Sequence, residues 1–283
     1  IVMQESQQFR IHLERLGYSK TSILMLPSCL KEFLEYTDKP TQSITPQDIK
    51  DYHTYLQERP NRRRTGGLSE SYISHHLYAL KLYFGWQEEL RQITINPISG
   101  LTFKTPESKP REILTTAEIT QLYKATQTLK EKAVLSLFYG CGLRRSEGEK
   151  LNLTDIHFGS GILYVREGKG NKRRAVPMSK KVSQDLKNYV EKERVATSQE
   201  QAMICNQYGT RTKGADLNRL LKNALERTKI DKSITLHCLR HSIATHLLES
   251  GLTIEYVRDF LGHKHLETTQ IYTRVKNSQL WNL

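Results

Sequence analysis

The sequence lacks both a long hydrophobic run and a cysteine framework. Its longest aliphatic clusters, such as residues 23–26, are far shorter than the roughly 20 apolar residues that a membrane-spanning helix needs. Its four cysteines are Cys29, Cys141, Cys205 and Cys238. None belongs to a CxxC pair, so neither a disulfide scaffold nor a structural zinc site is expected. These absences predict a protein of a reducing compartment with no membrane partner.

Signals for targeting and for nucleotide binding are absent as well. The opening IVMQES has neither an apolar core nor an Arg-rich amphipathic stretch, so no targeting peptide is expected. The chain contains no GxxxxGK[ST] loop, which argues against an ATP site of that type. We expect a cytoplasmic protein that uses no cofactor.

Positive charge is what the sequence has in excess. It carries 43 Lys and Arg residues against 30 Asp and Glu, a formal net charge of +13, with a pI near 9.5. Such an excess favours binding to polyanions, and nucleic acid is the leading partner, although a merely basic protein would have the same composition. The length of 283 residues exceeds the usual size of one domain and predicts two.

The first 103 residues have the pattern of a small helical domain. Apolar residues recur there at spacings of three and four, and TPQD at residues 45–48 is typical of a helix start. Another helix is expected over residues 69–90. Its apolar stripe favours a place in the core for Phe84 and Trp86 over a role in base stacking.

Two basic segments interrupt the helical pattern. Residues 59–67, RPNRRRTGG, form a polar loop whose side chains either contact the DNA backbone or are merely solvated. The candidate DNA-binding residues in this loop are Arg62, Arg63 and Arg64. Residues 104–112 hold two prolines without a helical or alternating pattern, which indicates an exposed linker between domains.

From residue 113 onward the pattern is mixed. Residues 162–166 and 173–177 alternate as two strands of a hairpin whose turn contains Lys169. Helices are expected over residues 115–125, 131–139, 179–195, 215–228 and 237–250. The predicted fold class is mainly α with a small β-sheet, in which a helical N-terminal domain precedes a mixed α+β domain over residues 113–283.

His237 and Arg240 are three residues apart, so one face of the last predicted helix presents both side chains. Arg240 can hold two phosphate oxygens with its planar guanidinium, and His237 beside it can move or share a proton. Such a pair alone is more often a surface contact or a satisfied histidine than a catalytic site.

Around this pair the sequence resembles the tyrosine recombinase/integrase family over nearly its whole length. GCGLRRSE at residues 140–147 is similar to the family's GLRxSE box, and GKGNK at residues 168–172 to its hairpin-lysine motif. HCLRH, LGH and TTQIY then follow in the family's order, with Tyr272 nine residues after His263. The resemblance assigns the catalytic positions to Arg144, Lys169, His237, Arg240, His263 and Tyr272.

The resemblance implies cleavage of a phosphodiester without a metal. Tyr272 would attack the scissile phosphate, while the guanidinium groups of Arg144 and Arg240 stabilise the charge on its non-bridging oxygens. Zinc is not expected either, because HCLRH has Cys238 where a zinc protease carries Glu. The other histidines, such as His246, are expected to pack or to lie on the surface.

Proton transfer would be divided between two residues. The unperturbed pKa of a tyrosine is about 10, so Tyr272 needs a base, and His237 is the candidate. Lys169 would protonate the departing 5′ oxygen. His263 would donate a hydrogen bond to the phosphate, and Glu147 would orient Arg144 without touching the substrate.

Five further basic residues are expected to contact the DNA backbone, positioning the duplex without reading its sequence. They are Lys172, Arg173, Arg174, Arg211 and Lys213.

The sequence departs from the family pattern in two places. Gly148 stands after GLRRSE where the family usually has an aliphatic residue, and glycine costs a helix about 1 kcal/mol relative to alanine, so a short or bent helix is expected. The chain also ends at Leu283, eleven residues after Tyr272. That tail is shorter than in many relatives and would weaken assembly in trans.

Together these features predict a site-specific recombinase that acts through a 3′-phosphotyrosyl intermediate in integration and excision, inversion or dimer resolution. The resemblance implies a SAM-like core-binding domain that clamps double-stranded DNA with the catalytic domain. It also implies a homotetramer on DNA that exchanges strands through a Holliday junction, with accessory DNA-binding proteins as candidate partners. The alternatives are a type IB topoisomerase-like enzyme that reseals one duplex, and a non-catalytic DNA-binding protein on the same scaffold.

Overall fold

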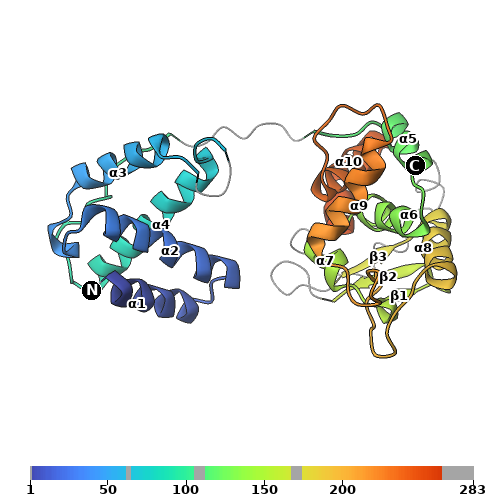
Figure 1. Cartoon of the computed structure of the whole chain (residues 1–283), viewed down its shortest axis with the longest axis horizontal. Helices are drawn as coiled ribbons and strands as arrows, with labels where there is room; N and C mark the ends of the chain where they lie inside the picture. The colour runs from blue at the N-terminus through green and yellow to red at the C-terminus, as the bar shows by residue number, and fades with distance from the viewer. Residues whose placement is uncertain (1, 62–64, 105–111, 167–173, 263–283) are drawn as a thin grey trace. The chain divides into compact units, whose positions relative to one another are not determined.

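The computed structural model describes residues 2–61, 65–104, 112–166 and 174–262. They form two compact units, Ile1–Lys109 and Pro110–Leu283 (Figure 1). Each unit has a hydrophobic core of its own.

The N-terminal unit is helical throughout its described residues. Its elements are α1 (Val2–Arg15), α2 (Lys20–Thr37), the 3-10 turn η1 (Thr41–Ser43), α3 (Pro46–Glu58) and α4 (Glu70–Glu89). Aromatic side chains meet at the centre, where Phe33 lies edge-on to Tyr52 and Phe84 at centroid distances of 5.0 and 6.1 Å. The core therefore joins α2, α3 and α4.

Short-range hydrogen bonds set where α3 and α4 begin. The hydroxyl of Thr45 accepts the Asp48 N–H, and the Asp48 carboxylate accepts the Thr45 N–H at 2.8 Å, which forms a capping box. Ser69 caps α4 by accepting the N–H of Tyr72. Both predicted helix starts are confirmed.

The predicted core side of α4 is also confirmed. Phe84 is fully buried. The Trp86 ring stacks on His12 with centroids 4.5 Å apart and also stacks on Phe9. Trp86 is therefore packed against α1 and is not presented for base stacking.

The C-terminal unit combines helices with a small antiparallel sheet, as the sequence predicts. The helices are α5 (Thr116–Lys124), α6 (Leu129–Leu135), α7 (Arg145–Lys150), α8 (Lys180–Lys192), α9 (Gly214–Glu226), α10 (Leu236–Glu249) and α11 (Ile254–Leu261). The strands, in the order β1-β2-β3, are β1 (Ile156–His157), β2 (Ile162–Val165) and β3 (Arg174–Pro177). Two further turns are η2 (Ser136–Gly140) and η3 (Leu153–Asp155).

The register of the hairpin decides which side chains enter the core. Leu163 of β2 pairs with Val176 of β3, and Val165 pairs with Arg174. All four are buried. Arg174 therefore lies on the same side of the sheet as Val176, as alternation along a strand requires. The two-residue strand β1 was not predicted.

Residues 131–139, predicted as one helix, are divided in two. α6 ends at Leu135, and Ser136–Gly140 form a π turn. Ser136 donates a hydrogen bond to the Asp185 carboxylate of α8 at 2.9 Å, and a Cβ on Gly140 would lie 2.4 Å from Val182. The π turn thus coincides with close packing against α8. A local sequence pattern does not predict such a turn.

The ends of the predicted helices agree with the structure to within a few residues, but α11 was not predicted. Its apolar positions Val257, Phe260 and Leu261 follow a helical spacing over only eight residues. No helix in the described parts of the chain is long and apolar enough to span a membrane.

Candidate active site

The start of α7 holds Arg144 and Glu147 together. Arg144 is the N-cap residue and Glu147 is the third residue of the helix. Glu147 Oε2 accepts the backbone N–H of Arg144 at 2.8 Å, and Oε1 accepts its guanidinium Nη1–H at 2.7 Å. One carboxylate therefore fixes both the backbone and the side chain of Arg144, which leaves that side chain 15% exposed.

The loop before α7 requires glycine at position 142. Gly142 has φ +57°, and a Cβ there would lie 2.7 Å from Leu261 Cδ2 and 3.2 Å from the Phe260 ring. The loop and the end of α11 consequently pack directly against each other. This contact brings the GCGLRRSE segment to the LGH segment, which is far away in sequence.

Glu147 is the centre of a cluster of guanidinium groups. Besides Arg144, it binds Arg174 through two parallel hydrogen bonds of 2.8 Å, and Arg240 Nη1 lies 3.9 Å from Oε2. Burial alone would raise the pKa of Glu147, but the hydrogen bonds and charges of Arg174 and Arg144 lower it to about 2. The carboxylate is therefore ionised, and three cations around one anion leave a charge of +2.

Arg240 is buried at the junction of three segments. Its guanidinium donates to the Gly142 carbonyl and, at 2.6 Å, to the Leu261 carbonyl. Burial, together with the charges of Arg144 and Arg174, lowers the pKa of Arg240 to about 9, while Glu147 opposes the shift. The group stays protonated at neutral pH, so its charge is held in the site.

His237 lies in the first turn of the same helix, three residues before Arg240. Its side chain is exposed, whereas Arg240 is buried. The predicted grouping on α10 is thus present, with the imidazole on the solvent side. The ring of His241 lies 5.9 Å from that of His237. His246 is buried and bonded to the Tyr139 hydroxyl at 2.9 Å, which confirms its predicted packing role.

Several predicted site residues lie outside the described parts of the chain. They are Arg62, Arg63, Arg64, Lys169, Lys172, Arg173, His263 and Tyr272. The structure does place their neighbours: β2 and β3 flank the segment of Lys169, and α11 leads to Gly262, which directly precedes His263.

The structure does not present Arg174 as the exposed DNA contact that the sequence predicts. Its side chain is 8% exposed, and both of its terminal nitrogens are bonded to Glu147. The sequence does contain a signal for this placement. Arg174 stands two residues before Val176 in a predicted strand, and side chains two residues apart point to the same face. If Val176 faces the core, Arg174 does so too.

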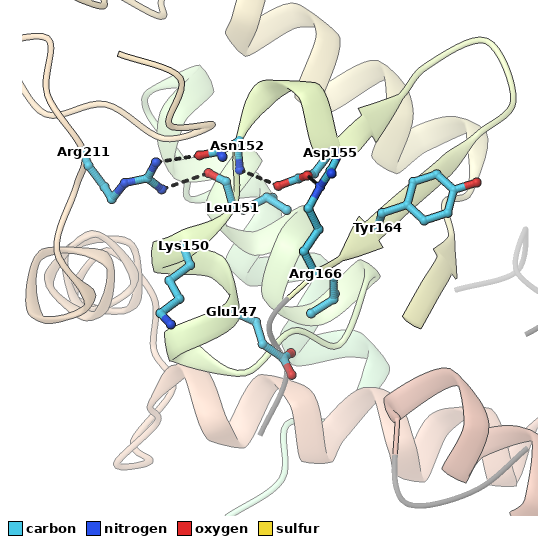
Figure 2. A pocket seen from close by; sticks show the side chains of 9 residues that line it. Glu147, Lys150, Leu151, Asn152, Asp155, Tyr164, Arg166 and Arg211 are labelled. Carbon is cyan, nitrogen blue, oxygen red and sulfur yellow. Dashed lines mark hydrogen bonds and ion pairs between the residues drawn. The ribbon is translucent and has the colours of Figure 1, made fainter. Parts of the chain in front are cut away.

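Arg211 also points into the protein, and its predicted DNA contact finds no support in this arrangement. Its guanidinium donates to the Leu151 carbonyl at 3.2 Å and to Asn152 Oδ1 at 2.6 Å (Figure 2). It also donates to the Glu149 carbonyl at 2.8 Å. It thereby satisfies carbonyl groups at the end of α7. Lys213, by contrast, is 73% exposed in its side chain, and its predicted DNA contact stays a prediction.

A cavity of about 310 Å³ adjoins Glu147 and is lined by the end of α7, η3 and β2 (Figure 2). Arg166, the residue after β2, reaches the carboxylate of Asp155. Asp155 in turn accepts the backbone N–H of Asn152 at 2.9 Å. The cavity thus lies between α7 and β2.

Gly148 does not disturb the site. As predicted, α7 is short, with six residues. Gly148 is buried, and a Cβ on it would lie 2.3 Å from Cζ of Phe138. The Phe138 ring occupies the space of the missing side chain.

The described residues contain no group of three or more His, Cys, Asp or Glu side chains placed to hold a metal ion. What they do contain is a concentration of guanidinium groups with hydrogen-bond donors, which is the chemistry that recognises a phosphate.

Comparison with known proteins gives consistent matches. The profile of the phage integrase family matches residues 112–279. A tyrosine recombinase XerA of Pyrococcus furiosus is 33% identical over 279 residues, covering 97% of this chain and 90% of its own. A tyrosine recombinase XerC of Chlamydia caviae is 34% identical over 278 residues, covering 94% of this chain and 85% of its own.

Solved structures share the fold. A lambda integrase dimer bound to a core site matches with a TM-score of 0.75 at 18% identity, covering 97% of this chain and 98% of that chain. A XerA recombinase crystal structure matches with a TM-score of 0.52 at 25% identity, covering 99% of this chain and 96% of that chain.

Proposed function

The chain belongs to the phage integrase family of tyrosine recombinases, and we propose that it breaks and rejoins DNA at specific sites through a 3′-phosphotyrosyl intermediate. The observation that supports this most directly is the cluster around Glu147. Arg144 and Arg240 come from distant parts of the sequence, and both lie against one ionised carboxylate with Arg174. The surplus positive charge suits a phosphodiester whose non-bridging oxygens gain negative charge during attack.

The reaction proceeds as a transfer between two oxygen atoms. The phenolic oxygen of Tyr272 bonds to the scissile phosphorus while the bond from phosphorus to the 5′ oxygen breaks. The phenolic proton passes to His237, and Lys169 gives a proton to the 5′ oxygen. His263 donates a hydrogen bond to the phosphate. Because Arg144 and Arg240 supply the charge stabilisation, the step needs no metal ion.

The intermediate keeps the phosphodiester in a form that can be rejoined. A 5′-hydroxyl from another strand can attack the phosphotyrosine and release Tyr272, so no ATP is consumed. In this proposal four copies of the chain hold two duplexes and exchange one pair of strands at a time through a Holliday junction. Residues 1–103 form the core-binding domain and residues 113–283 the catalytic domain. Accessory proteins and nucleoid association belong to the same proposal.

Trapping the covalent intermediate tests the proposed function. The substrate is a DNA site nicked so that the cleaved fragment diffuses away and rejoining cannot occur. The chain should form a denaturation-resistant adduct with this DNA, and Tyr272→Phe should form none because it lacks the attacking oxygen. EDTA should leave the rate of adduct formation unchanged.

The matched control for that experiment is Tyr208→Phe, which removes the hydroxyl of an exposed tyrosine in the loop before α9. This variant should form the adduct at the rate of the unaltered chain. An adduct that persists in Tyr272→Phe, or a strict requirement for magnesium, contradicts the proposal.

A further inference from the structure

Arg174 is bound at the centre of the cluster but belongs to neither the attacking nor the proton-transfer groups. It is the first residue of β3, five residues after Lys169 in the sequence. Its side chain reaches inward from the hairpin to the α7 carboxylate. We propose that Arg174 is a positioning residue that holds Glu147, the hairpin and the end of α11 in one arrangement. This inference rests on the proposed recombinase function.

The first contact of Arg174 is electrostatic. Its two terminal nitrogens bind the two oxygens of Glu147 at 2.8 Å each, so Arg174 provides most of the compensation for a buried negative charge. Arg144 makes one side-chain hydrogen bond to the same carboxylate, and Arg240 lies at 3.9 Å. Without Arg174 the uncompensated carboxylate would pull Arg144 and Arg240 toward itself and away from a phosphate.

The second contact is steric and involves Gly262. Gly262 ends α11 in the left-handed conformation with φ +69°. A Cβ on Gly262 would lie 2.5 Å from Arg174 Cδ and 3.0 Å from its Nε. The Arg174 side chain thus passes directly against the turn whose next residue is His263. The preceding residue, Leu261, accepts a hydrogen bond from Arg240 at 2.6 Å.

These contacts define how Arg174 acts. Its side chain is 8% exposed and both terminal nitrogens are turned toward Glu147, so the guanidinium is not presented to a substrate. Arg174 sets the distance between Glu147 of α7, the start of β3 and Gly262 at the end of α11. A shift of about 1 Å in such a site can lower a rate by about 100-fold. Loss of Arg174 is therefore expected to slow the chemical step and to leave DNA affinity nearly unchanged.

The test compares Arg174→Gln and Arg174→Lys with two control variants in the full-length chain. Lys213→Gln removes an exposed predicted backbone contact. Lys222→Gln removes a 75% exposed charge on the outside of α9 and should leave all measured values unchanged. Single-turnover adduct formation is measured at saturating nicked DNA, and DNA affinity is measured at several salt concentrations.

Arg174→Gln should slow adduct formation on the order of 10- to 100-fold, with the salt dependence of DNA affinity unchanged. Arg174→Lys should recover little of the rate, because an ammonium cannot bind both carboxylate oxygens in the same geometry. Lys213→Gln should show the opposite behaviour: weaker binding with a salt slope reduced by about one, and a normal rate at saturation.

A second substrate distinguishes two causes of a slower rate in Arg174→Gln: displacement of Arg144 and Arg240, and a smaller fraction of folded protein. It carries a neutral methylphosphonate at the scissile position, which develops less charge and depends less on guanidinium groups. The defect of Arg174→Gln should be smaller on this substrate than on the phosphodiester. An equal defect on both substrates, or a full rate in Arg174→Gln, overturns the inference.

The two proposals fail in different ways. If the unaltered chain forms no adduct, the recombinase function itself is wrong and the Arg174 comparison has no baseline. If the unaltered chain forms the adduct and Arg174→Gln matches it, only the positioning role is wrong. If Arg174→Gln instead lowers the salt slope of binding, Arg174 contacts DNA and the positioning role is also wrong.

Discussion

At the scale of single residues, the site depends on how a buried carboxylate is kept charged. Glu147 has no exposed side-chain surface, and removing an ion from water costs several kcal/mol unless partners replace the solvent. Arg174 and Arg144 supply these partners through hydrogen bonds of 2.7 to 2.8 Å. The same bonds orient Arg144, so the charge of Glu147 fixes the position of that guanidinium.

Glu147 should make stability depend on pH in the acid range. Its pKa is lowered from 4.5 to about 2 on folding, so its contribution is fully present above pH 4.5 and is lost as pH falls toward 2. Such a shift corresponds to about 3 kcal/mol. We expect the difference in unfolding free energy between the unaltered chain and Glu147→Gln to shrink steadily from pH 5 to pH 3. Urea unfolding at each pH measures it, and a difference that stays constant refutes the assignment.

The residue scale also shows where sequence reasoning stops. The sequence motifs predict that Arg144 and Arg240 belong to one site, and the structure brings both to Glu147. Whether a basic residue faces solvent or the protein interior could not be predicted, because it depends on partners that are distant in sequence. Arg174 is bound to Glu147, 27 residues away, and Arg211 to the end of α7, about 60 residues away. Composition predicted a DNA-facing role for both.

At the scale of elements, the short helix α7 depends on one close contact. Gly148 lies on the buried side of α7, against the ring of Phe138 from the π turn η2. Glycine weakens the helix intrinsically, by about 1 kcal/mol relative to alanine. Because Gly148 has no Cβ, the ring can lie directly against the helix. The π turn η2 and the glycine in α7 are each unfavourable locally. They are compatible because Phe138 of the turn packs against Gly148 of the helix.

This contact predicts opposite effects for two Gly→Ala changes. Gly148→Ala should destabilise the chain by roughly 1–3 kcal/mol, because a Cβ 2.3 Å from Phe138 Cζ forces the ring to move. Gly85→Ala in α4 should stabilise it by up to about 1 kcal/mol, since nothing lies within 4 Å of its Cβ position. Denaturant unfolding of both variants measures the signs.

A compensating change tests the cause of the Gly148 effect. Phe138→Leu removes the ring carbon closest to the added Cβ, so Gly148→Ala should cost less in that background than in the unaltered chain. Equal costs in the two backgrounds would show that the ring is not responsible, and a stabilising Gly148→Ala would contradict the packing altogether.

Element boundaries could be predicted where a few neighbouring residues decide them. Thr45 and Thr115 each start a helix by forming hydrogen bonds with the residue three positions later. Both partners of this capping box lie within four residues of sequence. The π turn from Ser136 depends instead on Asp185 and Val182 of another helix. The strand at Ile156 exists because β2 lies beside it. Neither partner can be inferred from local spacing.

At the scale of the whole molecule, charge and chemistry are carried by different residues. The net charge of +13 draws the chain to a polyanion, but part of the basic content is used internally. Arg174, Arg211 and Arg227 bind carboxylates or carbonyls of their own unit. Net charge therefore overstates the number of basic groups that are available to a polyanion.

The salt dependence of DNA binding measures how many basic side chains contact DNA phosphates. Each phosphate that a cationic side chain neutralises adds about 0.9 to the slope of log affinity against log salt, because condensed counterions are released. If the loop of residues 59–67 binds the backbone, replacing Arg62, Arg63 and Arg64 together with Gln should lower the slope by roughly one for each phosphate that is no longer neutralised. The same number of charges removed at exposed Lys187, Arg219 and Lys222 should lower it less. Equal decreases in the two triple variants would mean that DNA responds to the overall charge of the chain and not to this loop.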